Sequence, residues 1–146
     1  MAEKTVCIKH RDEWGNYHDY VYVKNDIVAY VRVSSPEPPF GYRKVYMVTY
    51  DKKAIWITSN GAQSYCGEVD ASDLEARLDM FLKSPVKEVC TYKLPRPVNP
   101  YIFKLRLSEL DIEVEVEDYE GFKKVMPTLY AKMREYFKRY LNVELP

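Results

Sequence analysis

The feature that most constrains the fold is a run of alternating acidic and apolar residues, DIEVEVE, at positions 111–117. Successive side chains of a β-strand point to opposite faces, so this run predicts a strand with one buried and one solvated face. The preceding segment, YIFKLRL at positions 101–107, alternates in the same way and carries Lys104 and Arg106 on one face. Together the two segments predict a β-hairpin with oppositely charged strands.

The register of this hairpin depends on the length of its turn. A two-residue turn would place Arg106 opposite Asp111. The same register would place Lys104 opposite Glu113, whereas a four-residue turn would shift each cation to the next acid on that face. Either register pairs opposite charges, which stabilises a hairpin by a few tenths of a kcal/mol, up to roughly 1, per pair. The acidic row is therefore explained as the solvated side of a hairpin, without a ligand.

Alternation recurs along the chain and predicts further strands. Asn25 and Asp26 suit a tight hairpin turn between two of them. Two proline-rich stretches, residues 34–42 and 93–100, predict loops, and so does the segment 60–70. We expect strands at residues 4–9, 18–24, 27–33, 44–50, 54–59, 86–92, 101–107 and 111–117.

Two segments have the apolar spacing of amphipathic helices. The first, residues 71–85, has Ser72 and Glu75 at capping-box spacing and ends at a proline. The second, about residues 119–141, carries Pro127 on its polar face, where a bend is expected.

The order of strands, helix, strands and helix predicts an α+β fold, because most strand connections are too short for crossover helices. We expect a largely antiparallel sheet of about seven to eight strands, with one short middle helix and one long amphipathic C-terminal helix packed on it. A chain of 146 residues suggests a single domain, residues 1–146. Residues 27–83 and 86–141 share one plan of strand, proline-rich loop, hairpin and helix, which suggests a weak internal repeat.

Charge and hydropathy limit the function classes. The chain has 22 basic and 22 acidic residues, and this balance argues against a protein that coats nucleic acid by bulk electrostatics. No apolar run approaches the roughly 20 residues of a membrane helix, and the N-terminus lacks a signal-peptide pattern. We therefore expect a cytoplasmic protein with no membrane partner.

Cysteine and amide usage point to the environment of the protein. Cys7, Cys66 and Cys90 are widely spaced and odd in number, which favours reduced intracellular thiols over a disulfide framework. A single glutamine, abundant Glu and Lys, and prolines gathered in loops are typical of hyperthermophilic proteins, such as those of archaea and their viruses.

Interleaved aromatic and basic residues are the strongest functional feature of the sequence. They fill the segment FGYRKVYMVTYDKKAIWIT, residues 40–58, where a three-residue turn would bring the aromatic side chains to one face of a strand pair. Aromatic rings on an open sheet, with cations at its margin, can stack unpaired bases. The leading hypothesis is a non-enzymatic protein that binds single-stranded nucleic acid. Its candidate residues, with two from the preceding strand that would extend the face, are Tyr46, Tyr50, Trp56, Lys44, Arg43, Lys52, Lys53, Arg32 and Tyr30.

Three alternatives stay open. The aromatic rings would equally suit a second packing layer, because tyrosine has an apolar body and a polar tip. The aromatic face or the acidic strand would also suit the interface of a protein-interaction module or a homo-oligomeric regulator. The third is a metal-dependent nuclease or hydrolase, in which Glu113 and Glu115, on one strand face, would hold the metal.

Few residues suit metal binding or covalent catalysis. Cys7, His10 and His18 are weak metal candidates, because structural zinc usually shows two paired ligand modules and only one half is present. Cys66 would be a possible fourth ligand. It also precedes a helix, as a nucleophilic thiol can, with Gly67 beside it, but no base is placed next to it. We expect no cofactor and name no catalytic residue.

Overall fold

The computed structural model describes residues 4–23, 25–35, 42–59, 63–83, 86–93, 101–107 and 110–145. For residues 42, 86–93, 101–103 and 107 it gives the backbone path. Most of the two predicted proline-rich loops, the turn at residues 108–109 and Pro85 lie outside the described residues.

Within these ranges, nine strands form two sheets, and helical segments follow the sixth and ninth strands. The strands are β1 (Val6–Ile8), β2 (Tyr20–Tyr22), β3 (Ile27–Ser35), β4 (Tyr42–Thr49), β5 (Lys53–Ser59), β6 (Ser64–Asp70), β7 (Val86–Lys93), β8 (Tyr101–Leu107) and β9 (Asp111–Val116). The helical segments are α1 (Ala71–Phe81), α2 (Tyr119–Val125), α3 (Pro127–Tyr136) and a π-helical turn, η1 (Phe137–Leu141).

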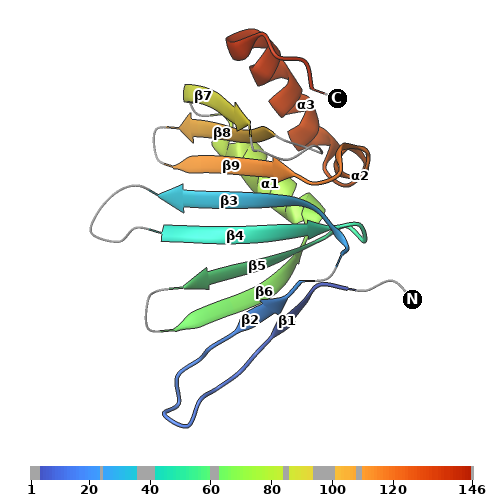
Figure 1. Cartoon of the computed structure of the whole chain (residues 1–146). Helices are drawn as coiled ribbons and strands as arrows, with labels where there is room; N and C mark the ends of the chain where they lie inside the picture. Colours follow the sequence, from blue (N-terminus) through green and yellow to red (C-terminus); the bar gives the residue numbers. More distant parts are fainter. Residues whose placement is uncertain are drawn as a thin grey trace.

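The main sheet has seven strands in the order β6-β5-β4-β3-β9-β8-β7, and neighbouring strands run antiparallel (Figure 1). This confirms the predicted α+β class with a mainly antiparallel sheet. The two stretches of the suggested repeat meet where β3 pairs with β9. Their first strands occupy unlike positions, because β3 lies at the centre of the sheet and β7 at an edge.

Alternation sets the strand registers as predicted. In the β8–β9 hairpin Arg106 lies opposite Asp111, and its Nε donates to the Asp111 carboxylate at 3.3 Å. Lys104 lies opposite Glu113, which confirms the two-residue register. The β4–β5 hairpin keeps the predicted faces, but its pairing is shifted by two residues from the predicted one, because β4 ends at Thr49 and β5 begins at Lys53, with Tyr46 opposite Trp56.

The helices cover one face of the main sheet and enclose the core (Figure 1). Every second side chain of the central strands points into this layer, where it meets the apolar stripe of a helix. Core residues are Val31, Ile112 and Val114 from the sheet, Leu74 and Leu78 from α1, and Phe122, Met133 and Phe137 from the C-terminal segments. No helix of the described residues combines the length and apolarity needed to cross a membrane.

The C-terminal helix is divided, which corrects the prediction of one long helix. Met126 has a non-helical backbone (φ −131°, ψ 65°) because the residue before a proline disfavours the helical region, and Pro127 then opens α3. The predicted capping box is also wrong, since α1 begins at Ala71 without a side-chain cap. The Glu75 carboxylate instead accepts the Leu129 N–H at 3.0 Å, and so caps the first turn of α3.

The β1–β2 hairpin lies on the other face of the sheet, along β6, and extends beyond its end (Figure 1). β2 pairs with β1, so the predicted hairpin turn at Asn25 and Asp26 is wrong. The Asp26 carboxylate accepts bonds from the N–H and hydroxyl of Thr5, and its carbonyl accepts the Tyr50 N–H at 3.1 Å. These bonds hold the chain where it passes from the small sheet to the large one. β6 forms where a loop was expected, and pairs with β5 along its whole length.

Candidate functional site

The nine residues predicted to bind nucleic acid do not form one surface. Lys44, Tyr46 and Trp56 share a face, but it is the face that α1 covers. Tyr46 is 5 % exposed and Trp56 is half-buried against the core. A base would have no open ring to stack on at Tyr46. Tyr46 and Trp56 therefore act as a packing layer between β4, β5 and α1.

Trp56 packs across β6 because its cross-strand partner is a glycine. A Cβ atom at Gly67 would lie 2.5 Å from the indole Cζ2, closer than real Cβ contacts allow. Lys44 Nζ lies 4.1 Å from the centre of the indole ring, a cation–π distance. Gly67 therefore makes room for a tryptophan, rather than for a substrate beside Cys66.

Tyr30, Arg32 and Arg43 lie on the opposite face, which corrects the expectation that the first two extend the aromatic surface. The register places Tyr30 opposite Met47 and Arg32 opposite Val45. Even-numbered residues of β3 thus lie beside odd-numbered residues of β4, and only the odd positions of β3 share the face of Tyr46.

Tyr50, Lys52 and Lys53 lie at the turn between β4 and β5. The half-exposed Tyr50 donates its hydroxyl to Asp118 at 2.9 Å, and this bond raises the pKa of Tyr50. The Lys53 ammonium is paired with the Asp70 carboxylate, which raises the pKa of Lys53. Lys52 is exposed and has a left-handed backbone (φ 65°). These groups shape the turn and attach it to the start of α2.

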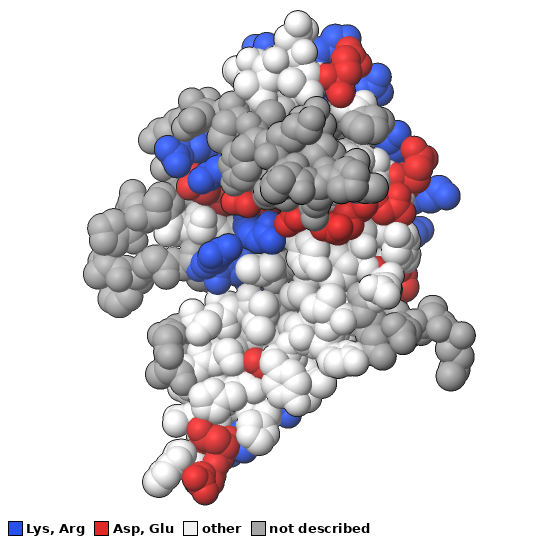
Figure 2. Space-filling view, in the orientation of Figure 1, with Lys and Arg blue, Asp and Glu red and all other residues white. Residues whose placement is uncertain are grey.

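The acidic row of β9 faces Arg32. Arg32 Nη2 lies 3.1 Å from Glu115 Oε2, and its Nη1 lies 3.7 Å from Glu113 Oε1. Glu115 is 9 % exposed, so its charge is compensated inside the protein rather than by water. A metal between these acids would have to take the place of the guanidinium. The row is one side of a charge ladder, visible in Figure 2 as a band of mixed charge across β3 and β9.

The largest group of exposed apolar side chains lies on the N-terminal hairpin, which the sequence analysis did not select. This hairpin and the residue after it hold six of the nine large hydrophobic residues that are exposed in the described part of the chain. Val6 pairs with Tyr22 and is 42 % exposed. Ile8 pairs with Tyr20, and the two tyrosines are 50–52 % exposed. We call Val6, Ile8, Tyr20 and Tyr22 the hairpin face.

The tip of the hairpin is an ordered turn that presents Trp14, which is 80 % exposed. Asp12 Oδ1 accepts the N–H groups of Trp14 and Asn16, at 2.9 and 2.8 Å, and Gly15 supplies the left-handed backbone (φ 84°). Asp12 Oδ2 lies 2.8 Å from His18 Nε2. Burial raises the pKa of Asp12, but these hydrogen bonds outweigh it and hold the pKa below its ordinary value.

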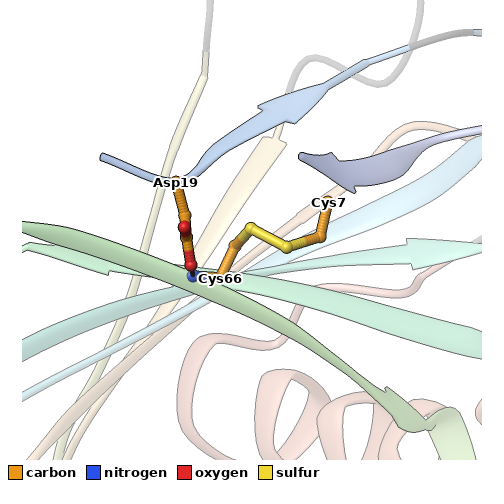
Figure 3. Close-up of side chains that lie close together, drawn as sticks. All are labelled: Cys7, Asp19 and Cys66. Atoms are coloured by element: carbon orange, nitrogen blue, oxygen red, sulfur yellow. Dashed lines mark hydrogen bonds between the residues drawn. A yellow bond between two sulfur atoms is a disulfide. The ribbon is translucent and has the colours of Figure 1, made fainter. Parts of the chain in front are cut away.

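The inner side of the hairpin is fixed to β6 by a disulfide between Cys7 and Cys66 (Figure 3). The expectation of reduced thiols is therefore wrong for this pair, and Cys66 has no free thiol to act as a nucleophile in this structure. Asp19 is 4 % exposed and accepts the Cys66 N–H at 3.0 Å, the Lys9 ammonium at 3.2 Å and the His10 N–H at 3.4 Å. Burial raises the pKa of Asp19, but these bonds outweigh it, so the pKa lies below its ordinary value.

The weak metal candidates Cys7, His10 and His18 do not come together. Among the described residues, Cys7 meets Asp19 and Cys66, and neither histidine belongs to this group. His18 instead lies against the carboxylate of the tip.

The sequence does carry a signal for the hairpin face. Residues 4–9 and 18–24 alternate, with apolar side chains at every second position. Alternation predicts two faces but not which of them is covered, and here that depends on a disulfide to a cysteine 59 residues away.

Comparisons with known proteins give no further guide. The sequence matches no protein-family model and no curated protein, and the fold matches no solved structure. A function for this chain is therefore inferred from its own geometry.

Proposed function

We propose that this protein is a binding module that docks another protein through the hairpin face. The observation that carries the proposal is the concentration of exposed apolar and aromatic side chains on one short element. Contiguous exposed apolar surface marks interaction sites in folded proteins. Tyrosine and tryptophan are enriched where such surfaces bind partners, because each ring buries a large area at a small cost in conformational entropy.

The charge of the hairpin favours a protein partner over a polyanion. Residues 4–23 carry three basic and three acidic side chains, so their net charge is zero. Figure 2 shows few Lys, Arg, Asp or Glu over this part of the sheet, apart from the tip. A surface depleted of charge and rich in tyrosine has the composition of the centre of a protein–protein interface.

The attachment of the hairpin adds affinity by keeping the face ordered. The disulfide fixes β1 to β6, and the hydrogen bonds of Asp19 fix β2 to the same strand. A preordered face loses little conformational entropy on binding, so more of the contact energy appears as affinity.

Site-specific photo-crosslinking tests the proposal. A photoreactive phenylalanine analogue is placed at Tyr20, and the matched control carries it at Tyr140, a tyrosine with 50 % exposure on η1. We expect protein crosslinks from position 20 in cells that make the protein, and few from position 140. Crosslinks from position 140 alone would contradict the proposal.

The affinity of the chain for the partner identified by crosslinking then tests how much the two face tyrosines contribute to binding. Replacing both tyrosines of the hairpin face by serine should weaken binding by about tenfold or more, as expected for aromatic interface residues. Tyr140→Ser should leave the affinity unchanged. Equal affinity of the wild type and the double variant, both folded by circular dichroism, would refute the hairpin face as the interface. Sedimentation of the purified chain shows whether the partner is a second copy.

Single-stranded nucleic acid is the second candidate ligand, now at the hairpin tip. The observation that favours it is the Arg11 guanidinium 5.2 Å from the ring centre of Tyr17, on the same hairpin tip that presents the exposed indole of Trp14. Base stacking with cation support predicts binding that weakens with salt. Labelled single-stranded DNA and RNA, titrated at two salt concentrations against wild type and Trp14→Ala, test this. No binding at low salt would exclude it.

A further inference from the structure

The inner side of the hairpin brings together three side chains that can each bind a metal. They are Cys7, Asp19 and Cys66, and one ligand atom from each lies within 4.8 Å of the others (Figure 3). Cys66 and Asp19 are buried, and Cys7 is half-buried. In the described part of the chain, no other group of three or more His, Cys, Asp or Glu side chains meets this condition.

The spacing of the two cysteines suits a metal as well as a disulfide. Their Cα atoms are 5.8 Å apart. Two thiolates on one zinc ion, with bonds of about 2.3 Å at a tetrahedral angle, place their sulfurs about 3.8 Å apart. Rotation about the two Cα–Cβ bonds can open the sulfurs to that spacing while the strands stay in place.

The carboxylate of Asp19 is held in a position where it can bind a metal ion. Three donors hold the Asp19 carboxylate in position: Oδ2 accepts from the Lys9 ammonium and the Cys66 N–H, and Oδ1 accepts from the His10 N–H alone. Oδ1 therefore keeps a second lone pair for a metal ion. Two thiolates and one carboxylate leave a Zn²⁺ site with one net negative charge. The Lys9 ammonium, 3.2 Å from Asp19 Oδ2, compensates that charge.

We propose that, in the reduced protein, Cys7, Cys66 and Asp19 bind one zinc ion, with water as the fourth ligand. A dithiol reductant gives two electrons and two protons to the disulfide sulfurs and itself becomes a disulfide. Zinc then binds both thiolates and displaces their two protons into solvent. Two sulfurs and one oxygen form a ligand set that zinc accepts, and the ion takes over from the disulfide in joining β1 to β6.

Cobalt substitution tests the site. The full chain with Cys90→Ser, which leaves two thiols, is reduced and titrated with Co²⁺ without oxygen. We expect one Co²⁺ per chain, thiolate-to-cobalt charge-transfer absorption, the strong visible bands of a tetrahedral ion, and displacement by one equivalent of Zn²⁺. The oxidised protein should give none of these signals. Absence of the charge-transfer band from the reduced protein would overturn the proposal.

Variants identify the ligands. Cys7→Ser should remove most of the charge-transfer absorption, and Asp19→Asn should weaken Zn²⁺ binding by at least about tenfold. His10→Ala and His18→Ala are the matched controls and should bind as the wild type does. Unchanged affinity in Asp19→Asn would exclude Asp19 as a ligand. If that variant is unfolded, protection of the two thiols from iodoacetamide by Zn²⁺ in the Cys90→Ser protein decides, and no protection refutes the site.

The metal site and the hairpin face point in opposite directions from the hairpin. A variant with both face tyrosines replaced by serine should keep the full cobalt spectrum, so failure of the metal site and failure of the proposed interface are distinguishable.

Discussion

Two segments of this chain mix aromatic and basic residues, and the fold places them in opposite environments. In β4 and β5, Lys44, Tyr46 and Trp56 lie beneath α1, with Tyr46 only 5 % exposed. In the N-terminal hairpin, Tyr20 and Tyr22 lie on a face that none of the described helices covers, and each is at least 50 % exposed. The same residue types therefore serve packing in one place and are available to a partner in the other. The difference is that α1 packs over β4 and β5, whereas the hairpin face is exposed.

The largest loss of stability should come from removing the disulfide that fixes the hairpin to β6. Replacing Cys7 and Cys66 together by serine removes a crosslink between residues 59 apart, which by chain entropy costs about 4 kcal/mol of stability. Urea unfolding under oxidising conditions measures the loss, with Cys90→Ser as the control. An unchanged midpoint would show that the hairpin is held by its other contacts.

Truncating one aromatic residue from each segment tests the contrast directly. Tyr46→Ala should lower the free energy of unfolding by about 3 kcal/mol, because it leaves a cavity in the core. Tyr20→Ala should change it by no more than about 0.5 kcal/mol, since its ring is half in water. Denaturant curves for the two variants give both values. Equal losses would mean that the hairpin face is packed as tightly as the core.

Filling the space beside Trp56 should have a smaller effect. Gly67→Ala puts a methyl group 2.5 Å from the indole, and overpacking of this kind costs about 2 kcal/mol. The tryptophan emission should shift as the ring moves, while Glu68→Ala, at an exposed position of the same strand, should change neither the emission nor the stability. A fully stable Gly67→Ala protein would contradict the assigned packing of Trp56.

The smallest expected effect is the pH dependence of the stability that the Asp19 carboxylate contributes. The folded-state pKa of Asp19 is lowered, so its contribution to stability is present above the unfolded pKa, about 4, and is lost as pH falls through the folded value. Asp19→Asn should therefore be less stable than wild type at pH 7, and the difference should narrow below about pH 4. Thermal unfolding between pH 7 and 2 measures it. A difference independent of pH would show that the Asp19 charge adds no stability.

Local pattern predicted the parts of the fold that depend on neighbouring residues. The β8–β9 register follows from alternation and charge, and Arg106 meets Asp111 as expected. The partner of β2 and the strand β6 were not predicted, and the bend predicted at Pro127 is a full break of the helix at Met126. The first depends on distant contacts, including the disulfide, and the break depends on the backbone preference before a proline.

The candidate site was less predictable than the fold, because burial depends on tertiary packing. Nothing in the order of residues around Trp56 says that α1 will cover them. In the same way, nothing near Tyr20 says that its side of the hairpin will stay open. The pairing of Tyr30 with Met47 shows how one register decides which face a side chain joins.

Acrylamide quenching of the two tryptophans tests the central claim most directly. Trp56→Phe leaves Trp14, at the exposed tip, and Trp14→Phe leaves Trp56, beneath α1. We predict a quenching slope several times steeper for Trp14 than for Trp56, which would place the accessible aromatic residues on the hairpin. Equal slopes in the two folded variants, or a steeper slope for Trp56, would contradict the account and restore the β4–β5 face as an open surface.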